Sequence, residues 1–445
     1  MTSSKKNKEI AVTVIGAGLA GTEAVYQLIR RQIPVRLIEM RPKVQTGAHT
    51  SDQFAELVCS NSVGSNLPDR ASGLLKEEMR LLGSYFMDVA YKYRVPAGNA
   101  LAVDRGAFSR EITRYLRTHT LIDFVNEEAL ELPEDGLVIV ATGPLTSPAL
   151  LESLQKRLGK KKLEFYDAVA PLVAADTIDR EVAFKGNRYG EPGNGDYLNC
   201  PLNKDQYLEF VKALLEAERI DLSDMEKNAR KKFFSACQPV EIIAESGVDS
   251  LRFGPMKPVG FTDPRTGRRP YAVVQLRQDN LLASLYNMVG FQTNLKHPEQ
   301  KRVFGMIPGL EKADFIRLGQ MHRNSYINSP ELLLPTLQLR ADPRIFFAGQ
   351  LCGVEGYTES AASGLLAGIN AVRIINGKEP VVAPPATMLG GLINYITFAG
   401  HKEFHPMNAN FGIFSGEDAN AKGEVRKEQI IRQARREFRE FFDQL

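Results

Sequence analysis

The stretch from Ile10 to Met40 constrains the fold of this chain more than any other part of the sequence. An apolar, β-branched run, Ile10–Ile15, leads into the glycine-rich turn Gly16–Gly21 (GAGLAG), and the apolar spacing of a helix follows. A second apolar run, Pro34–Ile38, ends at an acidic residue. Strand, glycine turn, helix and strand in this order predict a parallel βαβ unit, and hence an α/β fold of the Rossmann type.

Each glycine of the turn has a separate physical task. Gly16 permits the tight turn, Gly18 lets a pyrophosphate approach the backbone, and Gly21 lets the helix pack close to the strand. The helix N-terminus offers N–H groups and the positive end of the helix dipole to those phosphates. A turn kept for steric reasons alone would not need the acid at the end of the second strand, which is placed to accept ribose hydroxyls. The predicted contacts to an adenine dinucleotide are therefore Gly16, Ala17, Gly18, Leu19, Ala20, Gly21, Glu39 and Arg41.

Two later segments extend this predicted site. Leu137–Ala141 (LVIVA) reads as a buried strand that ends at a Thr-Gly pair. Ile345–Gln350 reads as another strand, and its glycine-rich continuation enters a helix of small residues, Ala361–Ala371. A second strand–glycine–helix unit this far along the chain is typical of an FAD site rather than an NAD site. These segments add Thr142, Gly143, Gly349, Gln350, Gly356 and Thr358 to the predicted cofactor-binding residues.

Composition excludes several classes of protein. The 445 residues suffice for two or three domains, and 43% hydrophobic with 24% charged residues is ordinary for a globular protein. No apolar run has the length of a membrane span, and the polar start has no signal-peptide core, so we expect a cytoplasmic protein. A net charge of +3 is too small to indicate nucleic-acid binding by itself. Any basic surface must be local.

The character of the sequence changes twice, which predicts a discontinuous domain. Residues 1–170 and 316–445 would form the two parts of the cofactor-binding domain, the second with a charged C-terminal helix from about Glu424. Residues 171–315 would form an inserted, smaller α+β domain. Within the first part, Leu74–Tyr93 reads as one helix.

The four cysteines have neither metal-ligand spacing nor the density of a disulfide scaffold, so we expect thiols and no metal site. Cys59 precedes Ser60-Asn61-Ser62, small polar residues that cap turns and helix starts. A helix N-terminus would stabilise a thiolate there and make Cys59 reactive. The alternative is an unreactive, half-buried loop cysteine. The complete set is Cys59, Cys200, Cys237 and Cys352.

The predicted insert carries a short, proline-broken and basic span. Its turn, Asp263–Pro270 (DPRTGRRP), contains three arginines, and Phe253 and Phe261 alternate with the charges. That combination suits an RNA backbone with bases stacked beside it. A solvated, arginine-rich hairpin explains the same composition, and the sequence leaves both interpretations open. The candidate RNA-binding residues are Arg252, Lys257, Arg265, Arg268 and Arg269.

With these pieces in place, the chain resembles the TrmFO family, the folate- and FAD-dependent tRNA (uracil-5-)-methyltransferases. The resemblance covers nearly the whole length, and several of its motifs are too long and unusual to arise from generic packing. The motifs are GAGLAG at 16–21, VCSNS at 58–62, LRFGPMKPVG at 251–260, DPRTGRRPYAVVQLR at 263–277, NMVGFQTNL at 287–295, MHRN at 321–324 and GVEGYTESAASG at 353–364.

The resemblance implies a glucose-inhibited-division-protein-like FAD domain with an inserted smaller domain, acting on a uridine in the T loop of tRNA. Uracil carbon 5 becomes nucleophilic once a thiolate has added at carbon 6, so a cysteine is required. The one-carbon unit would come from methylenetetrahydrofolate, the hydride from reduced FAD, and NAD(P)H would reduce the flavin. A base must finally remove the proton at carbon 5, and a second thiol can do this.

The resemblance also implies a cysteine pair, which Cys59 and Cys237 match. Cys237, in the predicted insert, is expected to attack uracil. Cys59, beside the flavin motif, would handle the one-carbon unit on the flavin or the carbon 5 proton, and the two roles could be exchanged. His322 would stack on the folate pterin, and Asn294, from a run of aromatics and amides typical of a pocket wall, would contact folate.

One motif departs from the family pattern. The family has Phe-Glu-Gly-Cys at the second cysteine, whereas this chain has Phe234-Ser235-Ala236-Cys237, which keeps the cysteine and changes the two residues before it. A related branch that methylates ribosomal RNA lacks this cysteine, so its presence favours tRNA. The alternatives are the same chemistry on ribosomal RNA, a non-catalytic flavin-containing RNA-binding protein, and a relative of the wobble-uridine modification proteins, which are longer and need a second protein. No obligate protein partner is expected here, and Cys200 and Cys352 are expected to be structural.

Overall fold

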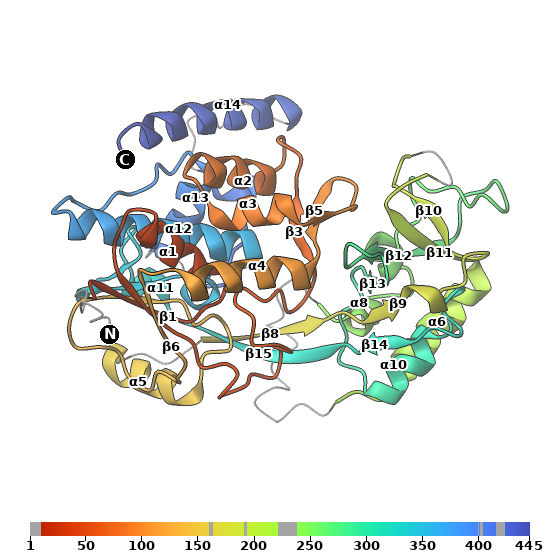
Figure 1. Ribbon diagram of the computed structural model, residues 1–445. Coiled ribbons are helices and arrows are strands. Elements are labelled where there is room, and N and C mark those ends of the chain that lie inside the picture. The colour runs from red at the N-terminus through yellow and green to blue at the C-terminus, as the bar shows by residue number, and fades with distance from the viewer. Residues whose placement is uncertain are drawn as a thin grey trace.

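A six-stranded sheet forms the centre of the larger of two lobes (Figure 1). The computed structural model describes residues 10–159, 163–190, 194–220, 238–398, 400, 404–414 and 423–445. All neighbouring strands in this sheet are parallel except the edge pair β16–β17, which confirms the predicted Rossmann-type core. In spatial order the strands are β16 (Gln338–Leu339), β17 (Asp342–Phe347), β7 (Leu137–Val140), β1 (Val12–Ile15), β2 (Val35–Ile38) and β6 (Ile122–Val125).

Helices α1 (Leu19–Ile29) and α12 (Tyr357–Ile375) pack against each other with their backbones in contact. A Cβ atom added at Gly364 would lie 2.1 Å from the carbonyl oxygen of Ala20, and one added at Gly368 would lie 2.9 Å from that of Ala24. The small residues of α12 therefore allow this close approach. The contact joins the first and last thirds of the chain.

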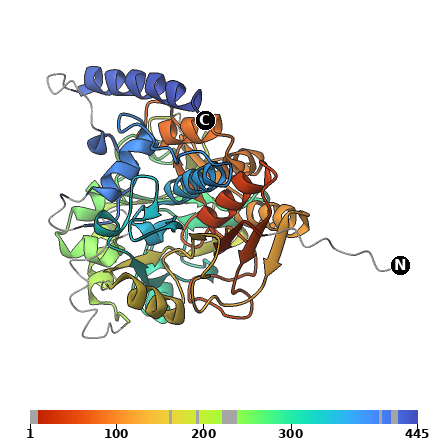
Figure 2. The same ribbon diagram turned by 90° about the vertical axis from the view of Figure 1, so that its left-hand side faces the viewer.

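The remaining helices of this lobe cover the sheet and its edges. The predicted helix Leu74–Tyr93 is wrong as a single element, because Gly83 adopts a positive φ of 70° and Ser84 starts a new helix by accepting a hydrogen bond from the Met87 N–H. Helix α14 lies across the outer side of α2 in both views (Figures 1 and 2), where Arg435 pairs with Glu77. The bounds are α2 (Ala71–Leu81), α3 (Tyr85–Lys92), α4 (Arg105–Thr118), α5 (Pro148–Leu158), α11 (Ser329–Leu332), α13 (Met388–Thr397) and α14 (Gly423–Phe442), with 3-10 turns at Gln350–Cys352 and Phe411–Ile413.

The smaller lobe is built on a separate antiparallel sheet with its own apolar core (Figure 1). In spatial order its strands are β10 (Phe184–Gly186), β11 (Tyr197–Leu202), β12 (Ala272–Gln278), β13 (Leu285–Met288), β9 (Leu172–Ala174) and β14 (Phe315–Arg317). Its helices are α6 (Lys204–Glu216), α8 (Val240–Glu245), α9 (Ser250–Phe253) and α10 (His297–Phe304), with a 3-10 turn at Ala175–Thr177.

Two chain crossings connect the lobes, and they pair with each other. β8 (Leu163–Val169) runs out of the larger lobe and β15 (Gln320–Tyr326) returns to it as an antiparallel ribbon. We propose on this basis that residues 171–315 are an insert in a domain made of 1–170 and 316–445, although β14 continues two residues past the second boundary. Among the described residues, no helix is both long and apolar enough to cross a membrane.

The contact between α1 and α12 predicts that this pair of helices does not tolerate a methyl group at its centre. We expect Gly364→Ala to lower the free energy of unfolding by about 1–3 kcal/mol, because the added Cβ must push the two backbones apart. Gly106→Ala is the matched control, because the only close atom to its Cβ would be at the flexible end of Arg110, with Asp104 Oδ1 at an ordinary contact distance of 3.6 Å. Chemical denaturation of both variants checks this, and equal stabilities would contradict it.

Candidate active site

The glycine turn at the end of β1 has the geometry that the sequence predicted. Gly16 has a φ of 99°, and a Cβ there would lie 2.6 Å from the carbonyl oxygen of Ala141. A Cβ at Gly21 would lie 1.8 Å from the Gly16 carbonyl oxygen, so only glycine lets α1 start this close to the turn. At Gly18, by contrast, the nearest atom to an added Cβ is 4.0 Å away. The turn thus leaves open space beside its backbone where α1 begins.

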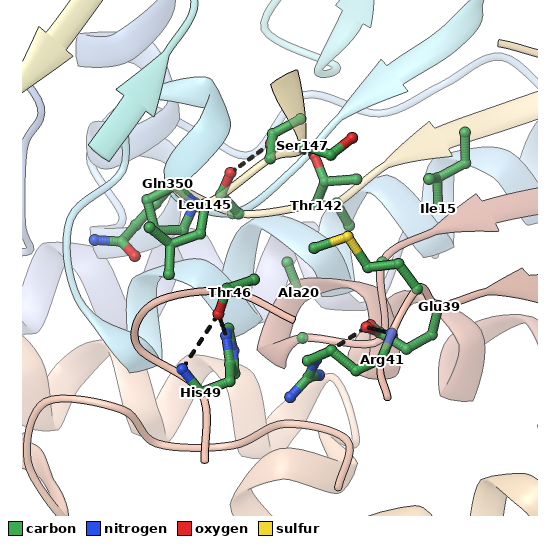
Figure 3. A pocket seen from close by; sticks show the side chains of 18 of the residues that line it. Ile15, Ala20, Glu39, Arg41, Thr46, His49, Thr142, Leu145, Ser147 and Gln350 are labelled. Atoms are coloured by element: carbon green, nitrogen blue, oxygen red, sulfur yellow. Dashed lines mark hydrogen bonds and ion pairs between the residues drawn. The ribbon is translucent and has the colours of Figure 1, made fainter. Parts of the chain in front are cut away.

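A pocket opens over this turn and runs along the carboxyl ends of the central strands (Figure 3). Its wall includes ten predicted cofactor-binding residues: Gly16, Gly18, Leu19, Ala20, Glu39, Arg41, Thr142, Gly143, Gly349 and Gln350. Its other lining residues include Thr46, His49, Glu56, Leu145, Ser147, Tyr357 and Ser360.

Glu39 and Arg41 form a buried pair at one side of the pocket (Figure 3). The Arg41 Nε lies 2.9 Å from Glu39 Oε1, and the Ala17 N–H donates to Oε2 at 2.8 Å. Burial alone would raise the pKa of Glu39, but the charge and hydrogen bonds of Arg41, with the Ala17 N–H, hold that pKa below its usual value. Glu39 is therefore an anion fixed at the pocket wall, and Ala17 contributes by holding it.

The other predicted cofactor contacts lie apart from the pocket wall. Gly21 packs under the turn, and Gly356, with a φ of 114°, precedes α12. The Thr358 side chain is buried, and its hydroxyl donates to the carbonyl oxygen of Val63 at 2.9 Å. Thr358 is thus able to meet a ligand only through the backbone N–H that it contributes to the first turn of α12.

Cys59 lies beside the pocket, between the lining residue Val58 and the strand β3 (Ser62–Ser65). The expectation of a helix N-terminus at this position is wrong, because the segment enters a small sheet of β3, β5 (Ala100–Val103) and β4 (Arg94–Val95). The N–H groups of Cys59 and Ser60 instead donate to the Tyr357 hydroxyl at 2.7 and 3.1 Å.

Tyr357 links this cysteine segment to the pocket, whose wall it also forms. Burial, and after it the nearby Cys59, raises the pKa of Tyr357, so the phenol stays neutral at physiological pH and keeps a proton to donate. Tyr357 stands in the motif GVEGYTESAASG, which by itself predicts no role for this residue. Nothing local in the sequence marks it, because its partners lie 298 and 297 residues away.

Three guanidinium groups hold the Cys59 segment, two of them from the smaller lobe. Arg277 of β12 donates to Ser60 Oγ at 2.7 Å and to Asn61 Oδ1 at 2.9 Å. Arg317 of β14 donates to the carbonyl oxygens of Val58 and Cys59 at 3.3 and 3.4 Å. From the larger lobe, Arg105 donates to the Leu57 carbonyl oxygen and pairs with Asp279 of the smaller lobe at 2.7 Å. Guanidinium groups therefore hold the Cys59 segment, in place of the expected helix N-terminus.

The interface beside this segment contains buried polar atoms that lack a protein partner within the described parts of the chain. They are Asp279 Oδ1, Arg317 Nε and Asn287 Nδ2. Burial, followed by the charge of Arg105, lowers the pKa of Arg317 to about 10, so it remains a cation at neutral pH. Buried polar atoms normally have partners. These atoms indicate where a polar substrate group is able to bind.

The other cysteines differ from Cys59. Cys200 lies in the core of the smaller lobe and Cys352 in that of the larger lobe, and burial raises the pKa of each thiol to about 12. Such thiols stay protonated and suit structural roles. No disulfide joins the described cysteines. Cys237 lies outside the described residues.

The two predicted folate contacts lie away from the pocket wall. The backbone of His322 lies in β15 opposite Asp167 of β8, in the ribbon between the lobes. Asn294 is buried in the smaller lobe, where its N–H donates to Glu241 and its Nδ2 to the Ile220 carbonyl oxygen. Its Oδ1 has no partner among the described residues, which leaves one acceptor for a ligand.

The predicted RNA-binding residues separate into two groups. The Arg252 guanidinium is occupied by contacts within the protein. It donates to the Tyr271 carbonyl oxygen, pairs with Asp249 and lies over the Tyr271 ring. Arg265 likewise pairs with Asp263. Arg265 is nevertheless exposed, as are the side chains of Lys257, Arg268 and Arg269.

The two phenylalanines of this region are not equivalent. The ring of Phe253 is 82% exposed, whereas Phe261 is only 4% exposed, packs edge-on against Phe184 and is covered by Arg188. The expectation that Phe261 faces bases is therefore wrong. Arg188, 73 residues earlier in the chain, gave no sequence signal for this packing.

Comparisons with known proteins agree with this geometry. The family model described as glucose inhibited division protein A matches residues 11–379. A methylenetetrahydrofolate--tRNA-(uracil-5-)-methyltransferase TrmFO from Heliobacterium modesticaldum is 54% identical, with 94% of this chain and 95% of that protein covered. The protein of the same name from Geobacter sulfurreducens is 53% identical, with 95% and 97% covered.

The solved structures include Aquifex aeolicus GidA in its form II crystal. It superposes with a TM-score of 0.68 at 17% identity, covering 97% of this chain and 73% of that one, and so supports the fold. The turn, the pocket and the cysteine segment all lie within the part of the chain that the family model matches. The chain belongs to the glucose inhibited division protein A family and, within it, to the TrmFO proteins.

Proposed function

We propose that this protein methylates carbon 5 of a uridine in tRNA, with methylenetetrahydrofolate as the one-carbon donor and FAD as its cofactor. The observation that carries the proposal is the Cys59 segment, which Tyr357 ties to the wall of a dinucleotide pocket. Relatives more than 50% identical over nearly their whole length bear the name of this methyltransferase. The T loop as the methylated region, and the cytoplasm as the location, are part of the proposal.

The pocket fits FAD by three features. The open side of Gly18 and the start of α1 suit a pyrophosphate. The Glu39 carboxylate is fixed where ribose hydroxyls are accepted in this fold. The second glycine turn, at Gly349 with a φ of 77°, packs against Ala20, whose Cβ would lie 3.0 Å from a Cβ added at Gly349, and this turn precedes α12. When bound, FAD would supply hydride chemistry, with NAD(P)H as the reductant.

The chain's own groups account for the remaining chemistry. A thiolate must add to uracil carbon 6, and a base must remove the proton from carbon 5. We assign the attack on uracil carbon 6 to Cys237. To Cys59 we assign the steps beside the pocket, including removal of the carbon 5 proton. Arg277, Arg317 and Arg105 surround the Cys59 segment and would stabilise negative charge there. His322 and Asn294 remain our proposed folate contacts.

The tRNA would bind across the exposed cations of the smaller lobe. Lys257, Arg268 and Arg269 are exposed, and Phe253 offers an open ring for stacking. Ribosomal RNA as the substrate has no specific observation in its favour, and neither does a non-catalytic role.

The cysteine assignments predict different defects for the two thiols. We expect Cys237→Ala to abolish both methylation and the covalent adduct with 5-fluorouridine-substituted tRNA, because no thiolate adds to carbon 6. Cys59→Ala should lower the methylation rate by about 10²–10⁴-fold while the adduct still forms, because a base is lost. Gel shift and methyl incorporation check this, with Cys200→Ala as the control. An adduct that needs Cys59 instead would exchange the two roles.

The Glu39 geometry predicts a defect in cofactor binding that has its own pH signature. We expect Glu39→Gln to weaken FAD binding about tenfold or more, because a charged acceptor is lost and the buried Arg41 keeps only its longer ion pair, with Glu56 at 3.4 Å. The depressed pKa of Glu39 stabilises the wild type above the ordinary glutamate pKa of about 4.3, and this contribution is lost as pH falls through the folded-state value.

Flavin retention on dialysis and unfolding at several pH values check this prediction. Glu127→Gln, a carboxylate on the rim of the same pocket, is the control. Full flavin retention by Glu39→Gln would contradict the placement of the ribose.

The exposed cations predict a change in the salt dependence of tRNA binding. We expect Arg268→Ala/Arg269→Ala to weaken binding and to reduce the slope of log affinity against log salt by about two, because two phosphate contacts are lost. Arg432→Ala/Arg436→Ala on α14 removes the same charge from the other lobe and should leave the slope unchanged. Equal effects of the two double variants would reject this surface.

A further inference from the structure

Tyr189 is an exposed aromatic residue in a backbone conformation that tyrosine rarely adopts. It occupies the third position of the turn Asn187–Gly190, which the Gly190 N–H closes on the Asn187 carbonyl oxygen at 2.9 Å. Its φ is 64°, a value for which glycine or asparagine is the usual residue at this position. The side chain is nevertheless 76% exposed. An unfavourable conformation that presents a ring to solvent is typical of a functional position rather than a packing one.

The neighbouring segment 257–260 supports this ring from behind. The Tyr189 N–H donates to the Gly260 carbonyl oxygen at 2.7 Å, and the Arg188 guanidinium donates to the carbonyl oxygens of Lys257 and Val259 at 3.1 and 2.6 Å. A Cβ added at Gly260 would lie 2.9 Å from Cδ1 of the ring. The ring therefore rests on glycine backbone while most of its surface stays open.

The charge beside the ring indicates the kind of partner. Lys257, in the supporting segment, is exposed, and the exposed Arg268 and Arg269 follow in the same basic span. An aromatic face beside cations is the combination that binds single-stranded nucleic acid, since bases stack on the ring while phosphates meet the charges. A purely apolar partner would not need the cations.

The position of the turn relates it to the active site. The turn leaves β10 after Gly186, which pairs with Tyr197 of β11, and Tyr197 pairs in turn with Arg277 of β12. Arg277 contacts Ser60, next to Cys59. The loop that carries Tyr189 thus projects from the end of the sheet that meets the Cys59 segment. A nucleotide that stacks there would belong to the same RNA as the reacting uridine.

We propose that Tyr189 is a stacking platform for a base of the RNA substrate that flanks the target uridine. This inference rests on the proposed function for the identity of the substrate. It adds a recognition residue outside the cofactor pocket and outside the basic hairpin.

The absence of tryptophan from the chain allows a direct test. Tyr189→Trp creates a single fluorophore at the platform, and Phe442→Trp creates one on α14, where the native ring is 43% exposed. Unmodified tRNA is added to each full-length, FAD-loaded variant. We expect saturable quenching of the indole fluorescence of the Tyr189→Trp variant through base stacking, and none for the α14 variant. Equal quenching of both would reject the platform.

Two further variants of Tyr189 distinguish the contribution of its ring to tRNA binding from the effect of its backbone conformation on folding. Tyr189→Gly removes the ring and relieves the positive φ, so it should fold at least as well as the wild type while binding tRNA about tenfold more weakly. Tyr189→Phe should bind as the wild type does, because the stacking face remains. Unchanged affinity of Tyr189→Gly would overturn the inference.

The same measurements distinguish this inference from the proposed function. A wild-type protein that binds tRNA but does not methylate it would refute the methyltransferase, whereas the Tyr189 variants would still decide the platform. A different outcome would be that a protein partner, and not RNA, quenches the fluorescence of Tyr189→Trp and binds Tyr189→Gly more weakly. That outcome would overturn the role of Tyr189 in base stacking and make it a protein-docking residue.

Discussion

Arginine side chains that cross from one lobe to the other are the interaction on which the arrangement of this protein depends. Arg277 and Arg317 leave the sheet of the smaller lobe and donate to Ser60, Asn61, Val58 and Cys59 of the larger lobe. Both guanidiniums are largely withdrawn from solvent, and burial lowers the pKa of each. A buried cation without acceptors is costly. The lobes therefore hold each other through the segment that carries Cys59.

The close packing of α12 against α1 is a second constraint, and it determines the side of the pocket that Tyr357 lines. Glycines on α12 bring its backbone against α1, so the start of α12 lies over the turn that begins α1. This places Tyr357, the first residue of α12, where its hydroxyl accepts hydrogen bonds from Cys59 and Ser60. The thiol segment is consequently fixed twice, by guanidiniums from the smaller lobe and by a phenol from the helix above the pocket.

Local patterns predicted the parts of the molecule that local physics determines. The β1–α1–β2 unit, β7 and β17 followed from apolar periodicity and from glycines, and ten of the predicted cofactor residues line one pocket. The failures involve distant contacts: the strand after Cys59, the burial of Phe261 under Arg188, and the roles of Tyr357 and Arg317. Arg317 meets Cys59 across 258 residues, and no spacing rule reports such a contact. The break at Gly83 is different, since a glycine inside an apparent helix is a local signal that periodicity outweighed.

The two-stranded connection between the lobes gives these contacts a further consequence. Only the β8–β15 ribbon carries the described chain from one lobe to the other, so their relative orientation depends on side-chain contacts such as Arg105–Asp279 and Arg277–Ser60. The end of the β-sheet that makes these contacts also bears the Tyr189 turn. In the proposed complex, RNA at this end would lie near the guanidiniums that position Cys59. Its binding would then act on the placement of the thiol through those same hydrogen bonds.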